Sequence, residues 1–148
     1  MPLVSALAAS HAPNILLEPG DEWEDFMNLH YSMAPQGSST RPTLEQQKKL
    51  RKDAEAAFAV LRADIEQARP DVLIVVANDQ FVNFFWNNIP TFFVTIGDEV
   101  KGQFTRHRFH YRNHKDLGRA IVRCGMQKGI DFSYGEYIEL QHTQVVPL

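Results

Sequence analysis

The sequence predicts an α/β fold with a mixed, partly parallel sheet flanked by helices. Two observations carry this prediction. Strand-like and helix-like segments alternate along the chain, and one apolar run, Asp71–Ala77, shows no polar alternation. Such a run is typical of a strand buried on both faces of a parallel sheet. The 148 residues predict a single domain over positions 1–148.

Four apolar runs bounded by turn-forming residues predict the strands. They are Leu3–Ala9, Asp71–Ala77, Ile89–Ile96 and Asp131–Leu140. The polar segment Asp98–Arg112 is expected to contain short strands. Residues Asn14–Pro42 are expected to form a long irregular connection, which in a compact domain is usually functional or mobile.

Two helices are predicted from capping patterns and apolar spacing. Thr43 and Gln46 have the spacing of a capping box, and apolar residues then recur every three or four positions until Pro70. The second helix is expected to begin at Asn113, capped together with Asp116. It is expected to end at Gly129, because glycine commonly terminates helices.

Composition excludes several classes of protein. Hydrophobic residues make up 44% and charged residues 22%, the balance of a soluble globular protein. The net charge is −3 and no Lys/Arg block stands out, so we expect no nucleic-acid partner. The chain has neither an apolar run of about 18 residues nor a basic signal-peptide start, so we expect no membrane association. The single Cys124 cannot form an internal disulfide, which favours a reducing, cytoplasmic compartment.

Polar side chains follow three of the predicted strands. His11 follows the first strand, the Asn78-Asp79-Gln80 triplet follows the second, and His142 follows the fourth. In open α/β sheets, ligands bind outside the carboxyl ends of the strands. We therefore expect these groups to converge from distant sequence positions, the alternative being that each is only a loop residue.

His107, His110 and His114 have a spacing similar to that of metal ligands. They do not share one helix, because the helix begins at Asn113, and zinc signatures need more partners than this chain offers. We favour a surface or substrate-loop role for His107 and His110. A zinc hydrolase that uses the three histidines is the alternative.

Five short motifs, in this order, resemble the class III extradiol ring-cleavage dioxygenases, the superfamily of the protocatechuate 4,5-dioxygenase catalytic subunit. The motifs are Ser10-His11-Ala12-Pro13, Pro70-Asp71-Val72 through Asn78-Asp79, Ile89-Pro90-Thr91-Phe92, Asn113-His114-Lys115-Asp116-Leu117, and His142 through Pro147-Leu148. The resemblance spans nearly the whole chain and covers the N-terminal half to two-thirds of that fold. It implies an Fe(II) enzyme that opens the ring of a catecholic or gallate-like substrate with O2.

The resemblance also implies roles for individual residues. His11 matches an iron ligand, His142 matches the acid/base near the iron, and His114 is similar to a further active-site histidine. Gln80 stands where the family's second iron histidine usually lies, and its amide oxygen is a poorer Fe(II) ligand than imidazole. His30, in the long connection, is a candidate substitute for that histidine.

Aromatic residues after the second strand are candidates for the substrate pocket. Phe84, Phe85 and Trp86 are expected to wall a flat ring-binding site, with a packed aromatic core edge as the alternative.

The family's glutamate ligand has no counterpart in this chain, so the domain is expected to be incomplete relative to the family. Another chain supplies the rest, the protein is a truncated relative, or the site has been remodelled. We expect a homo- or hetero-oligomer, because an incomplete sheet exposes an edge and apolar surface that a partner covers. The alternative function is a non-catalytic subunit or binding protein that kept the fold and lost the metal.

Overall fold

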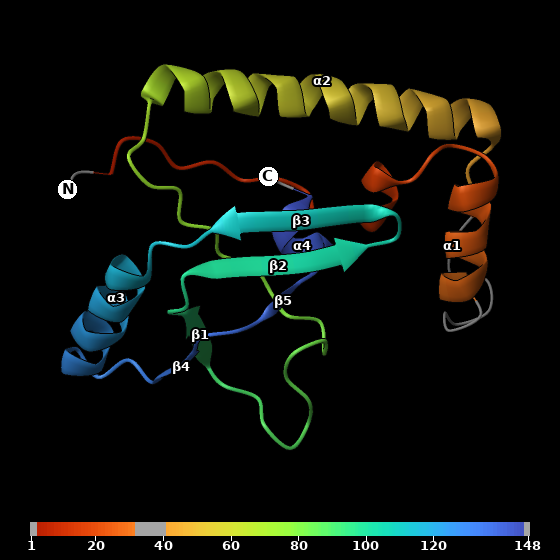
Figure 1. Cartoon of the computed structure of the whole chain (residues 1–148). Coiled ribbons are helices and arrows are strands. Elements are labelled where there is room, and N and C mark those ends of the chain that lie inside the picture. Colours follow the sequence, from red (N-terminus) through yellow and green to blue (C-terminus); the bar gives the residue numbers. More distant parts are fainter. Residues whose placement is uncertain (1–2, 32–40, 147–148) are drawn as a thin grey trace. The chain divides into compact units, whose positions relative to one another are not determined.

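The computed structural model describes residues 3–31 and 41–146, and the side chains of His30 and Tyr31 lie outside that description. The chain divides into two compact units, one within residues 1–73 and one within residues 74–146. The regular elements described in the first unit are all helical, and every strand described lies in the second (Figure 1). The single domain over positions 1–148 stays a prediction.

The first unit contains a short 3-10 helix and two α-helices. These are η1 (Pro13–Leu16), α1 (Asp21–Tyr31) and α2 (Leu44–Ala68). The predicted capping box at the start of α2 is confirmed. Gln46 N donates to Thr43 Oγ1 at 3.3 Å, and Thr43 N donates to Gln46 Oε1 at 2.7 Å. Arg69, at φ 44°, ends the helix immediately before Pro70, as predicted.

Gln47 joins α2 to the segment that precedes it. Its side chain is 1% exposed, Oε1 accepts a hydrogen bond from Gly20 N at 2.9 Å, and Nε2 donates to Glu24 Oε1 at 2.8 Å. The prediction of an irregular connection over Asn14–Pro42 was wrong for its described part, because η1 and α1 form there. Three acidic residues in the first turn of α1 favour that helix through its dipole. Residues 32–40 of the connection lie outside the described residues.

The second unit contains the strands and two further helices. The strands are β1 (Phe92–Thr95), β2 (Glu99–Phe104), β3 (His107–Arg112), β4 (Phe132–Gly135) and β5 (Glu139–Leu140). The helices are α3 (Lys115–Gln127) and α4 (His142–Val145). β1 and β4 pair in parallel, while β2 pairs antiparallel with β3 and parallel with β5 (Figure 1). The prediction of a mixed, partly parallel α/β fold is confirmed.

Helix α3 packs against β1 and β4 through its glycines. A Cβ at Gly118 would lie 2.8 Å from the Thr95 carbonyl oxygen, and one at Gly125 would lie 2.1 Å from Cε2 of Phe132. The absence of a side chain at these positions therefore lets the helix approach the strands. The predicted end of the helix at Gly129 is confirmed, with φ 76° at that residue.

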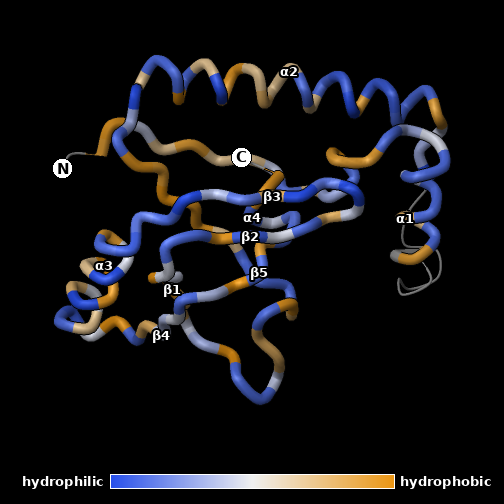
Figure 2. Tube along the Cα trace, viewed as in Figure 1, coloured by the Kyte–Doolittle hydropathy of each residue, from blue (hydrophilic) through white to orange (hydrophobic). Residues whose placement is uncertain are grey.

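Two predicted strands were wrong. Residues Leu3–Ala9 and Asp71–Ala77 form no strand, although Figure 2 shows how hydrophobic both runs are. Their side chains face solvent, with Leu3 85% and Val76 90% exposed. The physical reason is that a strand needs a neighbour for its backbone hydrogen bonds, and no described strand pairs with either run.

The other predicted strands formed with different limits. Ile89–Ile96 is shortened to β1, and Asp131–Leu140 is divided into β4 and β5. The predicted short strands within Asp98–Arg112 are confirmed as the β2–β3 hairpin. None of the described helices is long and apolar enough to cross a membrane.

Candidate functional site

The candidate site of the second unit is built on a tight turn, residues 78–84, called the Asp79 turn below. The carboxylate of Asp79 accepts hydrogen bonds from the backbone amides of Val82 at 2.9 Å, Asn83 at 2.8 Å and Phe84 at 2.9 Å. It also accepts one from Asn83 Nδ2 at 2.6 Å. A short aspartate side chain can cap successive backbone amides in this way, which stabilises a turn.

These hydrogen bonds alter the ionisation of Asp79. Partial burial acts to raise the pKa of its carboxyl group, but the hydrogen bonds from Asn83, Phe84 and Val82 outweigh that effect and hold the pKa below its ordinary value. Asp79 is therefore a fixed negative charge at neutral pH.

Gln80, one of the predicted site residues, lies at the strained point of this turn. Gln80 has φ 50° and Phe81 has φ 61°, a region that non-glycine residues seldom occupy. The hydrogen bonds to Asp79 hold the backbone in this conformation. Strain of this kind is concentrated at functional sites in proteins, and Gln80 is presented to solvent.

The Asp79 turn is bound to the segment that carries His142. Asn83 Nδ2 donates to the Glu139 carbonyl oxygen at 3.0 Å, and Glu139 N donates to Asn83 Oδ1 at 2.7 Å. Thr143 Oγ1 donates to the Asn78 carbonyl oxygen at 2.6 Å, and Thr143 itself is 1% exposed. The structure therefore brings together two of the three segments expected to converge, the one with Gln80 and the one with His142.

His142 is the first residue of α4 and follows β5 directly. Its imidazole lies against the ring of Phe104, with the two ring centroids 5.2 Å apart. It is half-buried, and the next residue, Thr143, is anchored to Asn78. A histidine held in this way has a defined orientation at the end of a strand.

His11 and His30 belong to the first unit. His11 is half-buried in the loop before η1, where Ala12 N donates to Ser10 Oγ at 3.3 Å. His30 lies in α1, and its side chain is outside the described part of the chain.

His114 has a structural contact at the start of α3. It is the N-cap residue, and its Nδ1 accepts a hydrogen bond from Leu117 N at 3.3 Å. The prediction that Asn113 caps this helix was wrong, because Asn113 Nδ2 instead donates to the carbonyl oxygens of Thr95 at 3.1 Å and Gly97 at 2.9 Å. The active-site role of His114 stays a prediction.

The aromatic residues after the Asp79 turn separate into two environments. Phe84 is half-buried, and its ring centroid lies 4.8 Å from that of Phe93. Trp86 is 84% exposed and contacts Phe81, with centroids 4.6 Å apart, while Phe85 is 55% exposed. Phe84 is thus part of the packing, and Phe85 and Trp86 are accessible to a ligand.

The proposed zinc group is not assembled. His107 and His110 are three residues apart on β3, so they project from opposite faces of the strand. The Nε2 atom of His110 lies 2.6 Å from Glu99 Oε2. Among residues 3–31 and 41–146, no group of three or more His, Cys, Asp or Glu is placed to hold a metal ion. The described residues therefore do not complete a three-ligand Fe(II) or zinc site.

Asn83 and Thr143, the residues that hold this site together, were not among the residues predicted from the sequence. Part of the signal was present, because an aspartate followed by an asparagine four positions later is compatible with a capped turn. The partners of Asn83 and Thr143 are 56 and 65 residues away, and no local pattern indicates them.

Comparison with known proteins gives a family match over nearly the whole chain. Residues 5–148 match the family described as the catalytic LigB subunit of aromatic ring-opening dioxygenase. One relative is a 2,3-dihydroxyphenylpropionate/2,3-dihydroxicinnamic acid 1,2-dioxygenase of Mycobacterium sp. (strain MCS), 24% identical over 96 residues, which cover 65% of this chain and 31% of the relative.

A protein of the same name from Rhodococcus globerulus is 23% identical over 94 residues, covering 64% of this chain and 30% of the relative. The matched region thus spans less than a third of the length of these curated relatives.

Proposed function

Because the chain belongs to the family of the catalytic LigB subunit of aromatic ring-opening dioxygenases, we propose that it forms part of a dioxygenase. This enzyme opens the ring of a catecholic or gallate-like substrate with O2. The family match over residues 5–148 carries the proposal. Both curated relatives are named as dioxygenases of dihydroxylated aromatic acids, which supports this substrate class.

His142 is the proposed acid/base. Transfer of a phenolic proton needs a base that titrates near neutral pH, and imidazole meets that need better than any other side chain. The contact with Phe104 and the anchoring of Thr143 restrict the orientation of the His142 ring. The Asp79 turn, tied to Glu139 through Asn83, holds Gln80 near the same segment.

Fe(II) is the proposed cofactor, and when bound it supplies the centre at which a catechol and O2 are brought together. His11 is the ligand that this chain is proposed to contribute. Gln80 offers a weaker amide oxygen, and His30 is the alternative at that position. The remaining ligands are proposed to come from another chain, because the domain is expected to be incomplete relative to the family.

The substrate ring is proposed to contact the exposed aromatic residues Phe85 and Trp86. Their flat faces are accessible, and the packing of offset rings favours an aromatic ligand by about 1 kcal/mol per pair. Phe84 is proposed to support them through its contact with Phe93.

The activity is tested by O2 uptake of the iron-loaded protein with a panel of catechols and gallate-like compounds. We expect turnover that falls by about a hundredfold or more in His142→Ala, as for loss of a general acid/base. Arg123→Ala, an exposed residue of α3, is the control and keeps full activity. Complete inactivity of the iron-loaded protein with every compound contradicts the proposal.

The metal site is tested separately by anaerobic Fe(II) binding. We expect one-to-one binding that is lost in His11→Ala and retained in Arg123→Ala. Binding that does not depend on His11 rejects this ligand assignment even if the protein consumes O2.

A specific observation also favours a second function, a non-catalytic subunit of the same family. Gln80 replaces the usual histidine, and the described residues complete no metal site. In this case the chain co-purifies with a larger homologous partner that carries the activity. A chain that turns over substrate alone excludes this alternative.

A homo- or hetero-oligomer and a cytoplasmic location remain predictions. The described residues leave many large hydrophobic side chains exposed, which supports the expectation of a partner.

A further inference from the structure

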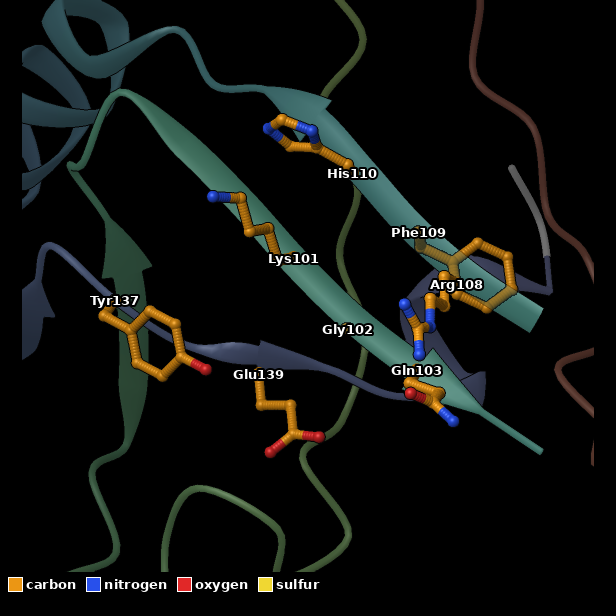
Figure 3. Close-up of a pocket in the computed structure, with 8 residues that line it drawn as sticks. All are labelled: Lys101, Gly102, Gln103, Arg108, Phe109, His110, Tyr137 and Glu139. Atoms are coloured by element: carbon orange, nitrogen blue, oxygen red, sulfur yellow. The ribbon is translucent and has the colours of Figure 1, made fainter. Parts of the chain in front are cut away.

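The short strand β5 has two sets of partners for its backbone. It pairs in parallel with β2, where Glu139 lies beside Lys101 (Figure 3). The backbone N–H and C=O groups of Glu139 are both bound by the side chain of Asn83. β5 is an edge strand of its sheet, and Asn83 binds it there as a neighbouring strand would. Because β5 ends two residues before His142, a contact that fixes β5 also fixes the segment that carries this histidine.

The carboxamide of Asn83 is the group that this position requires. Its Nδ2 donates one hydrogen bond to Asp79 Oδ1 at 2.6 Å and another to the Glu139 carbonyl oxygen at 3.0 Å, while Oδ1 accepts from Glu139 N at 2.7 Å. An ionised carboxylate has nearly the same shape but no donor. In this place it would set an oxygen against the oxygens of both Asp79 and Glu139, and two attractive contacts would become repulsive.

Asp79 fixes which atom of this amide faces each group of Glu139. Its carboxylate is negatively charged at neutral pH. A charged acceptor binds an N–H donor strongly and repels an amide oxygen. The Nδ2 atom of Asn83 is therefore directed towards Asp79, which leaves Oδ1 for the N–H group of Glu139.

The same turn also holds the chain after His142. Thr143 Oγ1 donates to the Asn78 carbonyl oxygen at 2.6 Å, and Gln144 Nε2 donates to the same oxygen at 3.1 Å. Asn78 and Asn83 both belong to the Asp79 turn, so this turn contacts the chain before His142 and after it. His142 lies between these two attachments.

We propose that Asn83 is a positioning residue for His142. It fixes the backbone of Glu139, and through β5 it sets the place of the imidazole against Phe104. This inference rests on the proposed function of His142 as the acid/base. An acid/base must lie within hydrogen-bonding distance of the proton that it moves, and a displacement of about 1 Å can cost a hundredfold in rate.

The position of the His142 ring is measured directly by its proton resonances in the full chain, without iron or substrate. The ring lies against Phe104, with centroids 5.2 Å apart, so the aromatic ring current displaces these resonances from ordinary histidine positions. They are assigned by their loss in His142→Ala. We expect Asn83→Asp to move them towards the positions of a solvent-exposed histidine, because the substitution removes the donor to Glu139.

Gln127→Glu is the matched control for Asn83→Asp. It makes the same exchange of an amide for a carboxylate at an exposed residue of α3. We expect the His142 resonances and the rate of O2 uptake to be unchanged in this variant. A shift caused by the added negative charge alone would appear in both variants.

The consequence for the reaction is measured by O2 uptake of the iron-loaded dioxygenase with the catechol that it turns over. We expect Asn83→Asp to lower kcat about tenfold or more and to leave KM within about twofold, because the position of His142 affects proton transfer more than substrate binding. Inactivity of the wild type contradicts the proposed function, whereas the resonances of His142 still decide whether Asn83 positions this ring.

Three results overturn the proposal. The first is unchanged His142 resonances in folded Asn83→Asp. The second is a rise in KM with an unchanged kcat, which assigns Asn83 to substrate binding. If Asn83→Asp does not fold, Asn83→Ala replaces it, because alanine removes the amide without placing a carboxylate beside Asp79. The backbone amide resonances of α3 report folding, and its loss in both variants is the third result, since Asn83 then holds the whole unit together.

Discussion

Two apolar segments have different structures in this protein. Val72–Ala77 reads Val-Leu-Ile-Val-Val-Ala and forms no strand, whereas Phe92–Thr95 forms β1. The difference lies in their neighbours. β1 pairs in parallel with β4 along its whole length, and α3 packs against both strands. In contrast, Val72–Ala77 has no described strand beside it, and Val76 is 90% exposed.

An apolar run therefore indicates that its side chains favour burial, but it does not indicate which strand or helix will cover them. A strand satisfies its backbone groups only through a neighbouring strand. The side chains of β1 have such a neighbour in the same chain, including the contact of Phe92 with Phe132, whose ring centroids are 5.5 Å apart. Substitutions at Gly97, Asp79 and Val76 test this difference, and they are given in order of decreasing expected loss of stability.

The largest effect is expected where the chain leaves β1 and passes β4. A Cβ at Gly97 would lie 2.1 Å from the carbonyl oxygen of Glu136, a backbone atom that cannot move aside independently. We expect Gly97→Ala to lower the free energy of unfolding by about 3 kcal/mol, at the upper end for overpacking. Urea-induced unfolding measures it.

Gly129→Ala is the matched control for this substitution. Gly129 has φ 76° and nothing within 4 Å of a new Cβ, so only backbone strain of about 1 kcal/mol is expected. Equal losses for the two variants show that the contact between the two strand ends does not stabilise β1.

An intermediate loss of stability is expected at the Asp79 turn, which follows Val72–Ala77 directly. Asp79→Asn keeps one acceptor oxygen but loses the charge, and we expect a loss of about 1 kcal/mol at neutral pH. The pKa of Asp79 is lowered in the folded protein. Its contribution is therefore complete above the unfolded value of about 3.9 and is lost as the pH falls through the lower, folded value.

Unfolding measured as a function of pH separates these two states of Asp79. Below the folded pKa of Asp79, the wild type and Asp79→Asn are expected to have nearly equal stability. Asp71→Asn, at an exposed carboxylate, is the control variant. A constant difference between Asp79→Asn and the wild type across this range shows that the charge of Asp79 does not hold the turn.

The smallest loss of stability is expected within Val72–Ala77, beside which no described strand lies. Val76→Asp places a charge on a side chain that is 90% exposed, so we expect the free energy of unfolding to change by no more than about 0.5 kcal/mol. Val122→Ala, at a residue only 7% exposed on α3, is expected to cost about 1–2 kcal/mol by loss of buried methyl groups. A severe loss in Val76→Asp shows that Val72–Ala77 is buried in the isolated chain.

The start of α2 and the end of α3 were the most predictable features of the fold, whereas α1 formed where an irregular connection was expected. Thr43 and Gln46 form the expected capping box, and Gly129 ends α3 as expected. Such signals involve residues only a few positions apart, so a short stretch of sequence is enough to recognise them. The beginning of α3 could not be predicted in this way. Asn113 donates hydrogen bonds to the carbonyl oxygens of Thr95 and Gly97, and His114 caps the helix instead.

The sequence predicted some residues of the candidate site but not the hydrogen bonds that hold them together. The sequence alone indicated Gln80 and His142 as site residues, although the strand expected before Gln80 does not form. The structure links their segments through Asn78, Asn83 and Thr143. The links join residues far apart in the chain, so they depend on how the backbone folds back. The iron-ligand role of His11 and the catalytic role of His142 stay predictions.

By itself, the sequence determined the mixed α/β class, the capping box of α2, the end of α3 and the short strands within residues 98–112, because propensity, capping and alternation act over a few residues. Only the tertiary structure decided which apolar runs become strands, which strands pair in the β3–β2–β5 sheet, and which segments hold His142. Each of these features depends on contacts with residues distant in sequence. A local pattern can indicate that a segment requires such contacts, but it does not identify the residues that make them.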